Sequence, residues 1–282
     1  MDMLTPATVR ALLTEHGIRP KKSLGQHFLA DPNTARRVTT LAAVQPGDAV
    51  LEIGPGLGSL TLALLERGAR VLALEVDATL ARVLESVLDR AGVGRDTVEV
   101  RVADAASVDW SAVLMDGSEW SCVSNLPYNV AVPVVVRLLE GAPAVTRIVV
   151  MVQREVGERL AAGPGDPEYG AVSVKVAYYA AASLLGTVPP TVFVPRPKVE
   201  SALVGLRRRE APPVSVPSEA ELFALVRSGF AQRRKMLRSS LRPVLGAQAA
   251  QVLEAAGVAP TARAETLGLE EWAALARSAA AA

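Results

Sequence analysis

Short apolar runs alternate with segments of helical period from Ala49 onward, and this alternation restricts the possible folds more than any other feature of the chain. The runs expected to form buried strands are Ala49–Ile53, Arg70–Val76, Thr97–Val102, Ser121–Leu126 and Arg147–Val152. The helices predicted among them are Leu60–Glu66, Thr79–Ala91 and Pro133–Leu139. Because strands and helices at this spacing favour right-handed crossovers and a parallel sheet, the sequence predicts an α/β domain.

The prolines of Glu210–Ser218 mark the end of this pattern. Before them the sequence predicts one more helix and a closing pair of strands, at Val172–Ala182, Leu184–Val188 and Ser201–Leu206. After them every local signal is helical, beginning at Ser218, a favourable residue for capping a helix. We therefore expect an α/β domain over residues 1–210 and a helical domain over residues 211–282.

The charges of the chain nearly cancel, since 30 Lys and Arg face 29 Asp and Glu among 282 residues. Half of the residues are hydrophobic, which is enough to bury a core and excludes a disordered protein. The balance also excludes a protein that coats nucleic acid without selectivity, but it leaves room for a local basic patch. A single cysteine, Cys122, and the lack of an apolar run near about 20 residues favour a soluble, cytoplasmic protein, which we expect to be a monomer.

A glycine-rich turn, Gly54-Pro55-Gly56-Leu57-Gly58, follows the first predicted strand. In a doubly wound sheet such a turn is where a nucleotide-like cofactor binds, although a tight turn without a ligand is the alternative for the glycines alone. Glu75 ends the next strand and is placed to accept the hydroxyl hydrogens of a ribose, and Asp104 follows the third strand and could accept from an adenine amine. Together they predict a cofactor site, for either a nicotinamide dinucleotide or S-adenosylmethionine. The residues expected to bind the cofactor include Gly54, Gly56, Glu75 and Asp104.

Five stretches carry a resemblance to a known family. The fourth predicted strand ends in Asn125-Leu126-Pro127-Tyr128, which is similar to the motif of amino-group nucleic-acid methyltransferases. The other stretches are SLGQHFL (Ser23–Leu29), EIGPGLG (Glu52–Gly58), PPTVFVPRPKVESALV (Pro189–Val204) and FAQRRKMLRSSL (Phe230–Leu241). In this order they resemble the rRNA adenine dimethyltransferase family over most of the chain. The resemblance implies a Rossmann-like class I S-adenosylmethionine methyltransferase sheet with a small C-terminal all-helical domain, S-adenosylmethionine as the methyl donor, and no metal.

The tetrapeptide also suits this chemistry on physical grounds. The N6 of adenine is a poor nucleophile because its lone pair is delocalised into the ring. Acceptors for its two N–H groups, namely the Asn125 amide oxygen and the carbonyl of Leu126 or Pro127, would localise that lone pair, so that positioning and electrostatics carry most of the rate. Tyr128 offers a flat face for a base removed from its stack. An Asn-Pro turn that only ends a strand would leave Tyr128 unexplained.

Other site residues receive their roles from the resemblance. His27 and Leu29, together with Asn125, would contact the cofactor, although the family usually has Asn where His27 stands. Prolines stiffen the loop around Phe193, and this ring would lie on the flipped adenine opposite Tyr128. The alternatives are a loop role for His27, packed against Phe28, and a gap-filling role for Phe193.

Six basic residues and no acid lie between Arg227 and Arg242. On one continuous helix, Arg234, Arg238 and Arg242 would recur every fourth position and form a stripe, with Gly229 as a point where the segment could break. A stripe without compensating acids favours phosphate binding over an ordinary solvated face. The expected RNA contacts are Arg227, Arg233, Arg234, Lys235, Arg238 and Arg242, with Arg207–Arg209 and Lys21-Lys22 as further candidates.

The sequence thus predicts an enzyme that methylates N6 of adenosines in RNA. The resemblance implies dimethylation of two adjacent adenosines in the 3′-terminal hairpin of 16S rRNA, within an assembling small ribosomal subunit. The alternatives are a 23S rRNA methyltransferase that confers antibiotic resistance, a non-catalytic ribosome-assembly factor with the same fold, and a dehydrogenase. Pro55, Leu57 and the PRPKVESALV stretch argue against the 23S enzyme, and the intact tetrapeptide argues against the non-catalytic factor.

Overall fold

A computed structural model describes residues 2–20, 25–114 and 117–282, and the chain divides into two compact units. The first unit consists of Met1–Gly157 and Ala182–Arg208, and the second of Glu158–Ala181 and Arg209–Ala282. The first unit thus ends near the boundary expected at residue 210, but the inserted segment Glu158–Ala181 belongs to the helical unit instead of the α/β domain. The reason is burial, because Tyr169, Val174 and Tyr178 lie in the core of the helical unit.

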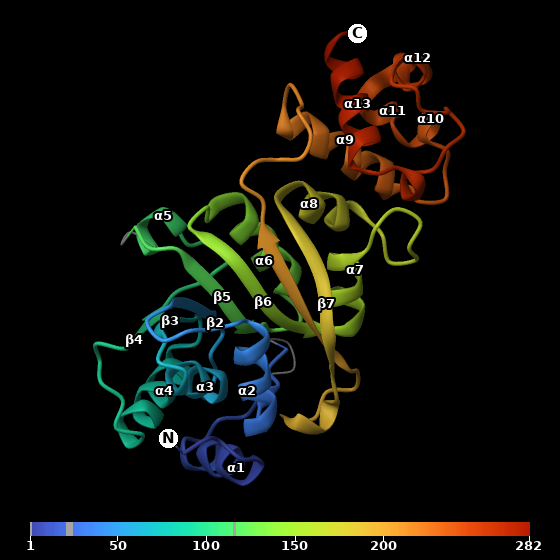
Figure 1. The fold of residues 1–282 in the computed structure, drawn as a ribbon. Coiled ribbons are helices and arrows are strands. Elements are labelled where there is room, and N and C mark those ends of the chain that lie inside the picture. Colours follow the sequence, from blue (N-terminus) through green and yellow to red (C-terminus); the bar gives the residue numbers. More distant parts are fainter. Residues whose placement is uncertain (1, 21–24, 115–116) are drawn as a thin grey trace. The chain divides into compact units, whose positions relative to one another are not determined.

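Seven of the described strands form one sheet at the centre of the first unit (Figure 1). Their order across the sheet is β4 (Val98–Val102), β3 (Arg70–Glu75), β2 (Ala49–Ile53), β5 (Trp120–Asn125), β6 (Val145–Gln153), β9 (Ser201–Arg208) and β7 (Ala180–Val188). Neighbours from β4 to β6 are parallel, whereas β9 runs antiparallel to β6. The strand order reverses between β2 and β5. In α/β sheets, ligands bind at such a reversal, beyond the carboxyl ends of the strands.

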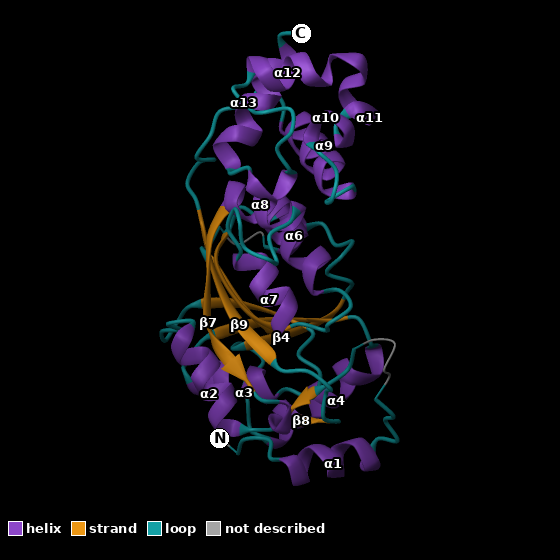
Figure 2. Cartoon of the chain, turned by 90° about the vertical axis from the view of Figure 1, so that its right-hand side faces the viewer, coloured by secondary structure: helices purple, strands orange, loops and turns teal. Residues whose placement is uncertain are grey.

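Helices cover both faces of this sheet, with α2, α3 and α4 on one face and α6 on the other (Figure 2). The bounds in this part of the chain are α1 Pro6–Glu15, α2 Pro32–Leu41, α3 Ser59–Glu66, α4 Ala78–Arg90, α5 Trp110–Val113, α6 Ala131–Gly141 and α7 Arg154–Ala161. The expected helices agree with α3, α4 and α6 to within two residues at each end. Helix α2 is not among the helices expected from the sequence. Its local signal is Asp31-Pro32, because the Asp31 side chain accepts from the Thr34 N–H and proline suits the first helical position.

A two-stranded sheet joins the N-terminal segment to the loop before β9. In it, β1 (Phe28–Leu29) pairs antiparallel with β8 (Phe193–Val194), and Leu29 lies opposite Phe193. The Ala30 N–H extends the pairing by donating to the Val192 carbonyl at 2.8 Å. This pairing buries the Phe193 side chain, which is 3% exposed, in the main hydrophobic core of the first unit.

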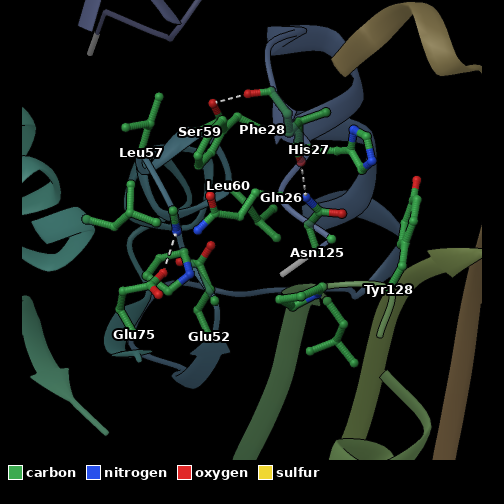
Figure 3. Close-up of a pocket in the computed structure, with 18 of the residues that line it drawn as sticks. Gln26, His27, Phe28, Glu52, Leu57, Ser59, Leu60, Glu75, Asn125 and Tyr128 are labelled. Carbon is green, nitrogen blue, oxygen red and sulfur yellow. Dashed lines mark hydrogen bonds between the residues drawn. The ribbon is translucent and has the colours of Figure 1, made fainter. Parts of the chain in front are cut away.

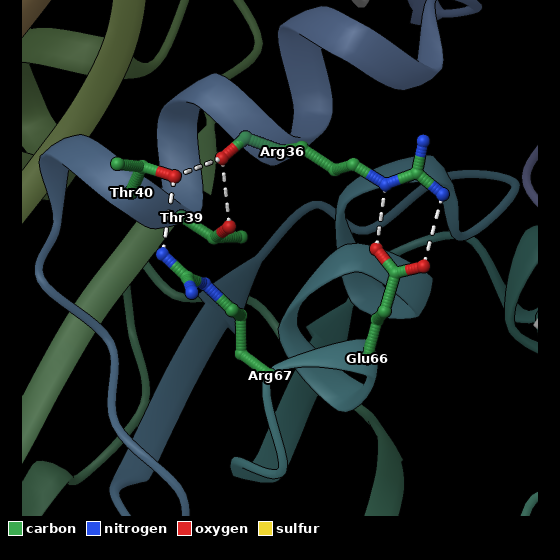
Figure 4. A network of polar contacts seen from close by, with 5 residues as sticks. All are labelled: Arg36, Thr39, Thr40, Glu66 and Arg67. Carbon is green, nitrogen blue, oxygen red and sulfur yellow. Dashed lines mark hydrogen bonds and ion pairs between the residues drawn. The ribbon is translucent and has the colours of Figure 1, made fainter.

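Two arginines join α2 to α3 on the surface (Figure 4). Arg36 donates to both carboxylate oxygens of Glu66, at 2.7 and 2.9 Å. Arg67 donates to the Thr40 hydroxyl at 3.1 Å, and the hydroxyls of Thr39 and Thr40 donate to the Arg36 carbonyl. Hydrogen bonding to Arg36 holds the pKa of Glu66 below its ordinary value. Because exposed pairs contribute at most about 1 kcal/mol, these contacts orient α2 more than they stabilise it.

The second unit is helical and is built around Trp272, whose exposure is 0%. Its helices, in chain order, are α8 Ala171–Tyr179, α9 Glu219–Ala231, α10 Leu237–Ser240, α11 Arg242–Leu245, α12 Ala249–Ala255 and α13 Leu269–Ala280. Gly229 lies inside α9, and a Cβ on it would come within 2.5 Å of the Trp272 ring. Gly229 is therefore a packing residue and not a helix break. None of the described helices is long and apolar enough to cross a membrane.

The continuous helix expected to carry Arg234, Arg238 and Arg242 as a stripe is wrong. Helix α9 ends at Ala231, and the three arginines lie in a turn, in α10 and at the start of α11. The reason is tertiary, because the Leu237 and Arg238 N–H groups donate to the carbonyls of Ala262 and Pro260 instead of to a preceding helical turn.

Arg208, at the end of β9, closes the carboxyl end of α6. Its guanidinium donates to four carbonyls at 2.8–3.0 Å, those of Leu138, Leu139, Ala142 and Val145. The last turn of a helix leaves carbonyls without partners and carries partial negative charge, so a cation with several donors suits it. The donors of Arg208 are thus engaged within the fold, and Arg209 similarly donates to the Ala177 carbonyl.

Replacing Arg208 with Met should lower the free energy of unfolding by about 3 kcal/mol, because charged hydrogen bonds are lost and carbonyls stay unpaired. Urea denaturation followed by tryptophan fluorescence measures this, since Trp110 lies beside Gly141 at the end of α6. The matched control is Arg207→Met, at an exposed neighbour, where we expect a change of about 0.5 kcal/mol or less. Equal losses in the two variants would contradict the capping role.

Candidate active site

A pocket opens beyond the carboxyl ends of β2, β3 and β5, at the reversal of strand order (Figure 3). The predicted site residues that line it are His27, Leu29, Gly54, Gly56, Glu75, Asn125, Leu126, Pro127 and Tyr128. Asp104 and Phe193 are not among its lining residues. Lys21, Lys22 and the first two residues of the SLGQHFL stretch lie outside the described residues. The fold thus brings three of the five sequence stretches to one place.

The glycine-rich turn has a backbone that other residues adopt only under strain. Gly54, Gly56 and Gly58 have φ values of 68°, 58° and 95°. The space is equally restrictive, because a Cβ on Gly58 would lie 2.6 Å from a methyl carbon of Leu84. Glycine at position 58 is therefore required by both conformation and packing.

Glu75 is held against this turn by backbone N–H groups. Its carboxylate accepts from Gly56 at 3.2 Å and from Asp77 at 3.0 Å. The side chain is buried, and burial raises its pKa. A carboxylate has further lone pairs, so Glu75 can also accept from a ligand in the pocket.

Asp104 lies on the same edge of the sheet but stays outside the pocket lining. It follows β4, whose Val102 pairs with Glu75, and its side chain is exposed. One carboxylate oxygen accepts from the Ala106 N–H at 2.9 Å and so shapes the local turn. Asp104 follows the strand that pairs with the strand of Glu75, so the two acids lie at the same edge of the sheet. Asp104 is not among the residues that line the pocket.

Glu52 is a pocket residue that the sequence analysis did not single out as a site residue. It is 1% exposed and accepts from the Thr61 hydroxyl at 2.6 Å. Burial raises its pKa to about 8; the Thr61 hydrogen bond opposes this rise, and the charge of Glu75 adds to it. The available signal was an acid within the apolar strand Ala49–Ile53, since a carboxyl is seldom fully buried without a role.

Asn125 is oriented by the N-terminal segment. Its amide nitrogen donates to the His27 carbonyl at 3.3 Å, and its amide oxygen is turned toward the Tyr128 side of the pocket (Figure 3). The next residue, Leu126, is buried and donates from its N–H to the Met151 carbonyl at 3.1 Å. The end of β5 therefore presents an acceptor oxygen to the pocket.

The aromatic ring beside Tyr128 in the structure is that of His27, whereas Phe193, expected on the opposite face of a flipped adenine, is buried. The His27 and Tyr128 rings lie 5.3 Å apart with their planes at 34°. His27 donates from Nδ1 to the Pro195 carbonyl at 2.8 Å, and the Tyr128 hydroxyl is hydrogen-bonded to Ser201 at 2.8 Å. Phe193 is directed into the core by its pairing with β1, which explains the difference.

Comparison with known proteins identifies the family of the chain. The family model described as ribosomal RNA adenine dimethylase matches residues 17–281. The chain belongs to the ribosomal RNA adenine dimethylase family. This membership contradicts the dehydrogenase alternative and agrees with the class I methyltransferase sheet. Within the described ranges, the dimethylase has no group of three His, Cys, Asp or Glu side chains that could hold a metal ion.

Its relatives cover nearly the whole chain. Ribosomal RNA small subunit methyltransferase A of Thermobifida fusca is 50% identical, over 97% of this chain and 95% of its own length. The protein of the same name in Streptomyces coelicolor is 47% identical, over 97% and 96%. Among solved structures, a dimethyladenosine transferase from Plasmodium falciparum is 24% identical with a TM-score of 0.75, over 88% of this chain and 96% of that one. The 23S rRNA methyltransferase ErmE is 26% identical with a TM-score of 0.66, over 89% and 98%.

The six basic residues expected to bind RNA are all exposed in this dimethylase, but they are not equivalent. Arg233 donates to the Glu265 carboxylate at 2.9 Å and to the Pro167 carbonyl. The other five side chains have no polar partner in the described part of the chain, and these are Arg227, Arg234, Lys235, Arg238 and Arg242. Arg233 is thus engaged within the helical unit, whereas the others are available to a ligand.

Glu52 makes the stability of the dimethylase depend on pH. Its pKa is about 8 in the folded chain and 4.5 in the reference state, so between these values the folded chain holds a proton that the unfolded chain has released. The free energy of unfolding should therefore fall as the pH rises from about 5 to about 8, and level off above that. At 1.36 kcal/mol per pKa unit, the fall due to Glu52 is about 5 kcal/mol.

Urea denaturation of the wild type and of Glu52→Gln between pH 5 and 9 tests this dependence. The amide stays neutral, so the difference in unfolding free energy between the two proteins isolates the titration of Glu52. We expect the wild type to lose stability relative to Glu52→Gln as the pH rises. A difference that stays constant across the range would show that Glu52 does not carry a proton in the folded state.

Proposed function

We propose that this dimethylase transfers methyl groups from S-adenosylmethionine to N6 of two adjacent adenosines in the 3′-terminal hairpin of 16S rRNA, during assembly of the small ribosomal subunit. The observation that carries the proposal is that the glycine turn, Glu75 and the Asn125–Tyr128 tetrapeptide line one pocket. The names of the relatives at 47–50% identity support the small subunit as the target. ErmE, at 26% identity, gives less support to a 23S rRNA target.

The donor set of the pocket fits S-adenosylmethionine. Glu75 would accept the ribose hydroxyls, and the turn at Gly54 and Gly56 lets the ligand approach the backbone without a Cβ in the way. His27, Leu29 and Asn125 would lie along the methionine portion. Asp104, which lies outside the pocket lining on the same edge of the sheet, would accept from the adenine amine. When bound, the cofactor supplies an electrophilic methyl group on a sulfonium.

The tetrapeptide would activate the acceptor nitrogen. The Asn125 amide oxygen takes one N–H of the target amine, and a backbone carbonyl takes the other. The Pro127 carbonyl already accepts from the Val130 N–H at 3.1 Å, which favours the Leu126 carbonyl for this role. Two acceptors pull the nitrogen toward tetrahedral geometry and localise its lone pair, and this preorganisation lowers the barrier without proton transfer.

Tyr128 would hold the base by stacking and not by acid–base chemistry. Burial raises the pKa of its hydroxyl, so the phenol stays protonated near neutral pH. Its ring lines the pocket, and the flat face of an aromatic ring can stack on a flipped base. The methylated nitrogen is acidic enough to lose its proton to water, so no strong base is needed.

The unpaired cations of the helical unit would bind phosphates of the rRNA. These exposed cations are Arg227, Arg234, Lys235, Arg238 and Arg242. The last four lie in a turn and two short helices, and not on the single helical stripe that was expected. Such contacts position the RNA and carry no sequence information, so selectivity would come from the shape of the rRNA site.

Asn125→Ala should abolish methyl transfer, because one of the two acceptors for the amine is lost, while binding to the small subunit persists. Transfer of tritiated methyl groups to undermethylated 30S subunits measures the reaction, and cosedimentation measures binding. Asn33→Ala, at an exposed position of α2, is the control of the same residue type and should be fully active. Unchanged methylation by Asn125→Ala would refute the mechanism.

The substrate can be tested directly with the unmodified enzyme. We expect methylation of isolated 30S subunits, with dimethyladenosine mapped to the 3′-terminal hairpin of 16S rRNA, and none of protein-free 23S RNA. Methylation of 23S RNA would favour the resistance enzyme. Binding to 30S subunits without methyl transfer would favour the assembly factor.

A further inference from the structure

The loop between β8 and β9 carries two cations that the proposed mechanism does not use. Arg196 and Lys198 are exposed, and within the described residues neither side chain has a hydrogen bond or an ion pair. The acid nearest to them in the chain, Glu200, already accepts from Arg154 at 3.1 Å. The loop therefore presents two positive charges that this acid does not neutralise.

Both ends of this loop are fastened to the wall of the pocket. At its start, the Pro195 carbonyl accepts from His27 at 2.8 Å, and at its end, Ser201 is hydrogen-bonded to the Tyr128 hydroxyl at 2.8 Å. Arg196 directly follows the first anchor, and Lys198 stands three residues before the second. Their Cα atoms thus lie within about 4 Å and about 11 Å of those anchors along the chain. The charges are held close to His27 and Tyr128, two of the aromatic residues that line the pocket.

The prolines make this loop stiff. Pro195 and Pro197 stand on either side of Arg196, and each fixes its own φ angle. Pro197 is buried, whereas the cations before and after it are exposed. A loop that is rigid before the ligand arrives loses little conformational entropy on binding, so its charges contribute more to affinity.

A base that enters the pocket brings its own negative charges with it. A flipped nucleotide stays attached to the phosphates before and after it, and these must follow to the mouth of the pocket. Arg and Lys on a rigid rim match two adjacent phosphates, Arg as a bidentate donor and Lys as a point charge. The charges of this loop therefore fit the backbone of the target nucleotide and not its base.

We propose that Arg196 and Lys198 bind the phosphates that flank the target adenosine and so seat its base against Tyr128. This inference rests on the proposed function and adds to it a second RNA-binding element. That element lies in the α/β unit and is separate from the cations of the helical unit.

The test is the double variant Arg196→Ser/Lys198→Ser, assayed on undermethylated 30S subunits. We expect kcat/KM for methylation to fall by about tenfold or more, since two charged contacts are lost. Saturating subunits should not restore the rate, because the base is poorly seated, so kcat should fall as well. The slope of log kcat/KM against log salt concentration should become shallower by about 1.4, at about 0.7 per phosphate contact. Calorimetry should show an unchanged affinity for S-adenosylmethionine.

The matched control is Arg10→Ser/Arg95→Ser, which removes the same charge at exposed positions of α1 and of the turn before β4. It should leave kcat, KM and the salt slope unchanged. The exchange Arg196→Lys/Lys198→Arg, which conserves both charges, should restore most of the rate.

The outcomes separate the two proposals. An active wild type with an equally active loop variant and an unaltered salt slope would overturn this inference alone. Loss of S-adenosylmethionine binding in the loop variant would also overturn it, because the loop would then act on the cofactor site. A wild type that fails to methylate 30S subunits would overturn the proposed function and this inference with it.

Discussion

The glycine turn at Gly54–Gly58 is the constraint on which the rest of the active site depends, because three elements pack into the space its missing side chains leave. A Cβ on the first, second or third glycine would come within 3.2, 3.0 or 2.6 Å of Pro127, Phe28 and Leu84, respectively. The turn is thus in close contact with the end of β5, the N-terminal segment and α4. A methyl group on any of the three glycines would push the neighbouring element away. The turn therefore assembles the walls of the pocket as well as leaving room for a ligand.

Local signals were sufficient for the elements that lie close together in the chain. The buried run Ala49–Ile53 followed by glycine predicted β2 to the residue, because burial on both faces and a tight turn are properties of a few neighbouring residues. Glu75 and Asn125 could be placed beside that turn because the carboxyl ends of parallel strands share one edge of a sheet. The part of the site built from strand ends was accordingly predictable without knowledge of distant contacts.

Contacts between distant segments account for most of what the sequence did not predict. The strand pairing of Leu29 with Phe193, which buries the Phe193 ring, and the position of the His27 ring beside Tyr128 were not foreseen from the sequence. The segment Glu158–Ala181 joins the helical unit through buried tyrosines whose partners lie far along the chain. The helix expected beyond Ala231 is interrupted because carbonyls from another segment take its N–H groups. In each case contacts with a distant segment outweigh a local preference.

Contacts within the chain also decide which basic side chains are free to bind a ligand. This explains how a protein of formal net charge +1 can still bind RNA. An arginine is available to a phosphate only if carbonyls and carboxylates of its own chain leave its donors free. Arg208 is engaged by four carbonyls and Arg233 by a carboxylate and a carbonyl, although both stand in basic runs of the sequence. Arg196 and Lys198 stand in no such run, yet the structure leaves both without a partner among the described residues. The hydrogen bonds that a basic side chain already makes within its own chain therefore decide which cations stay available to a polyanion, and the density of basic residues along the sequence does not show this.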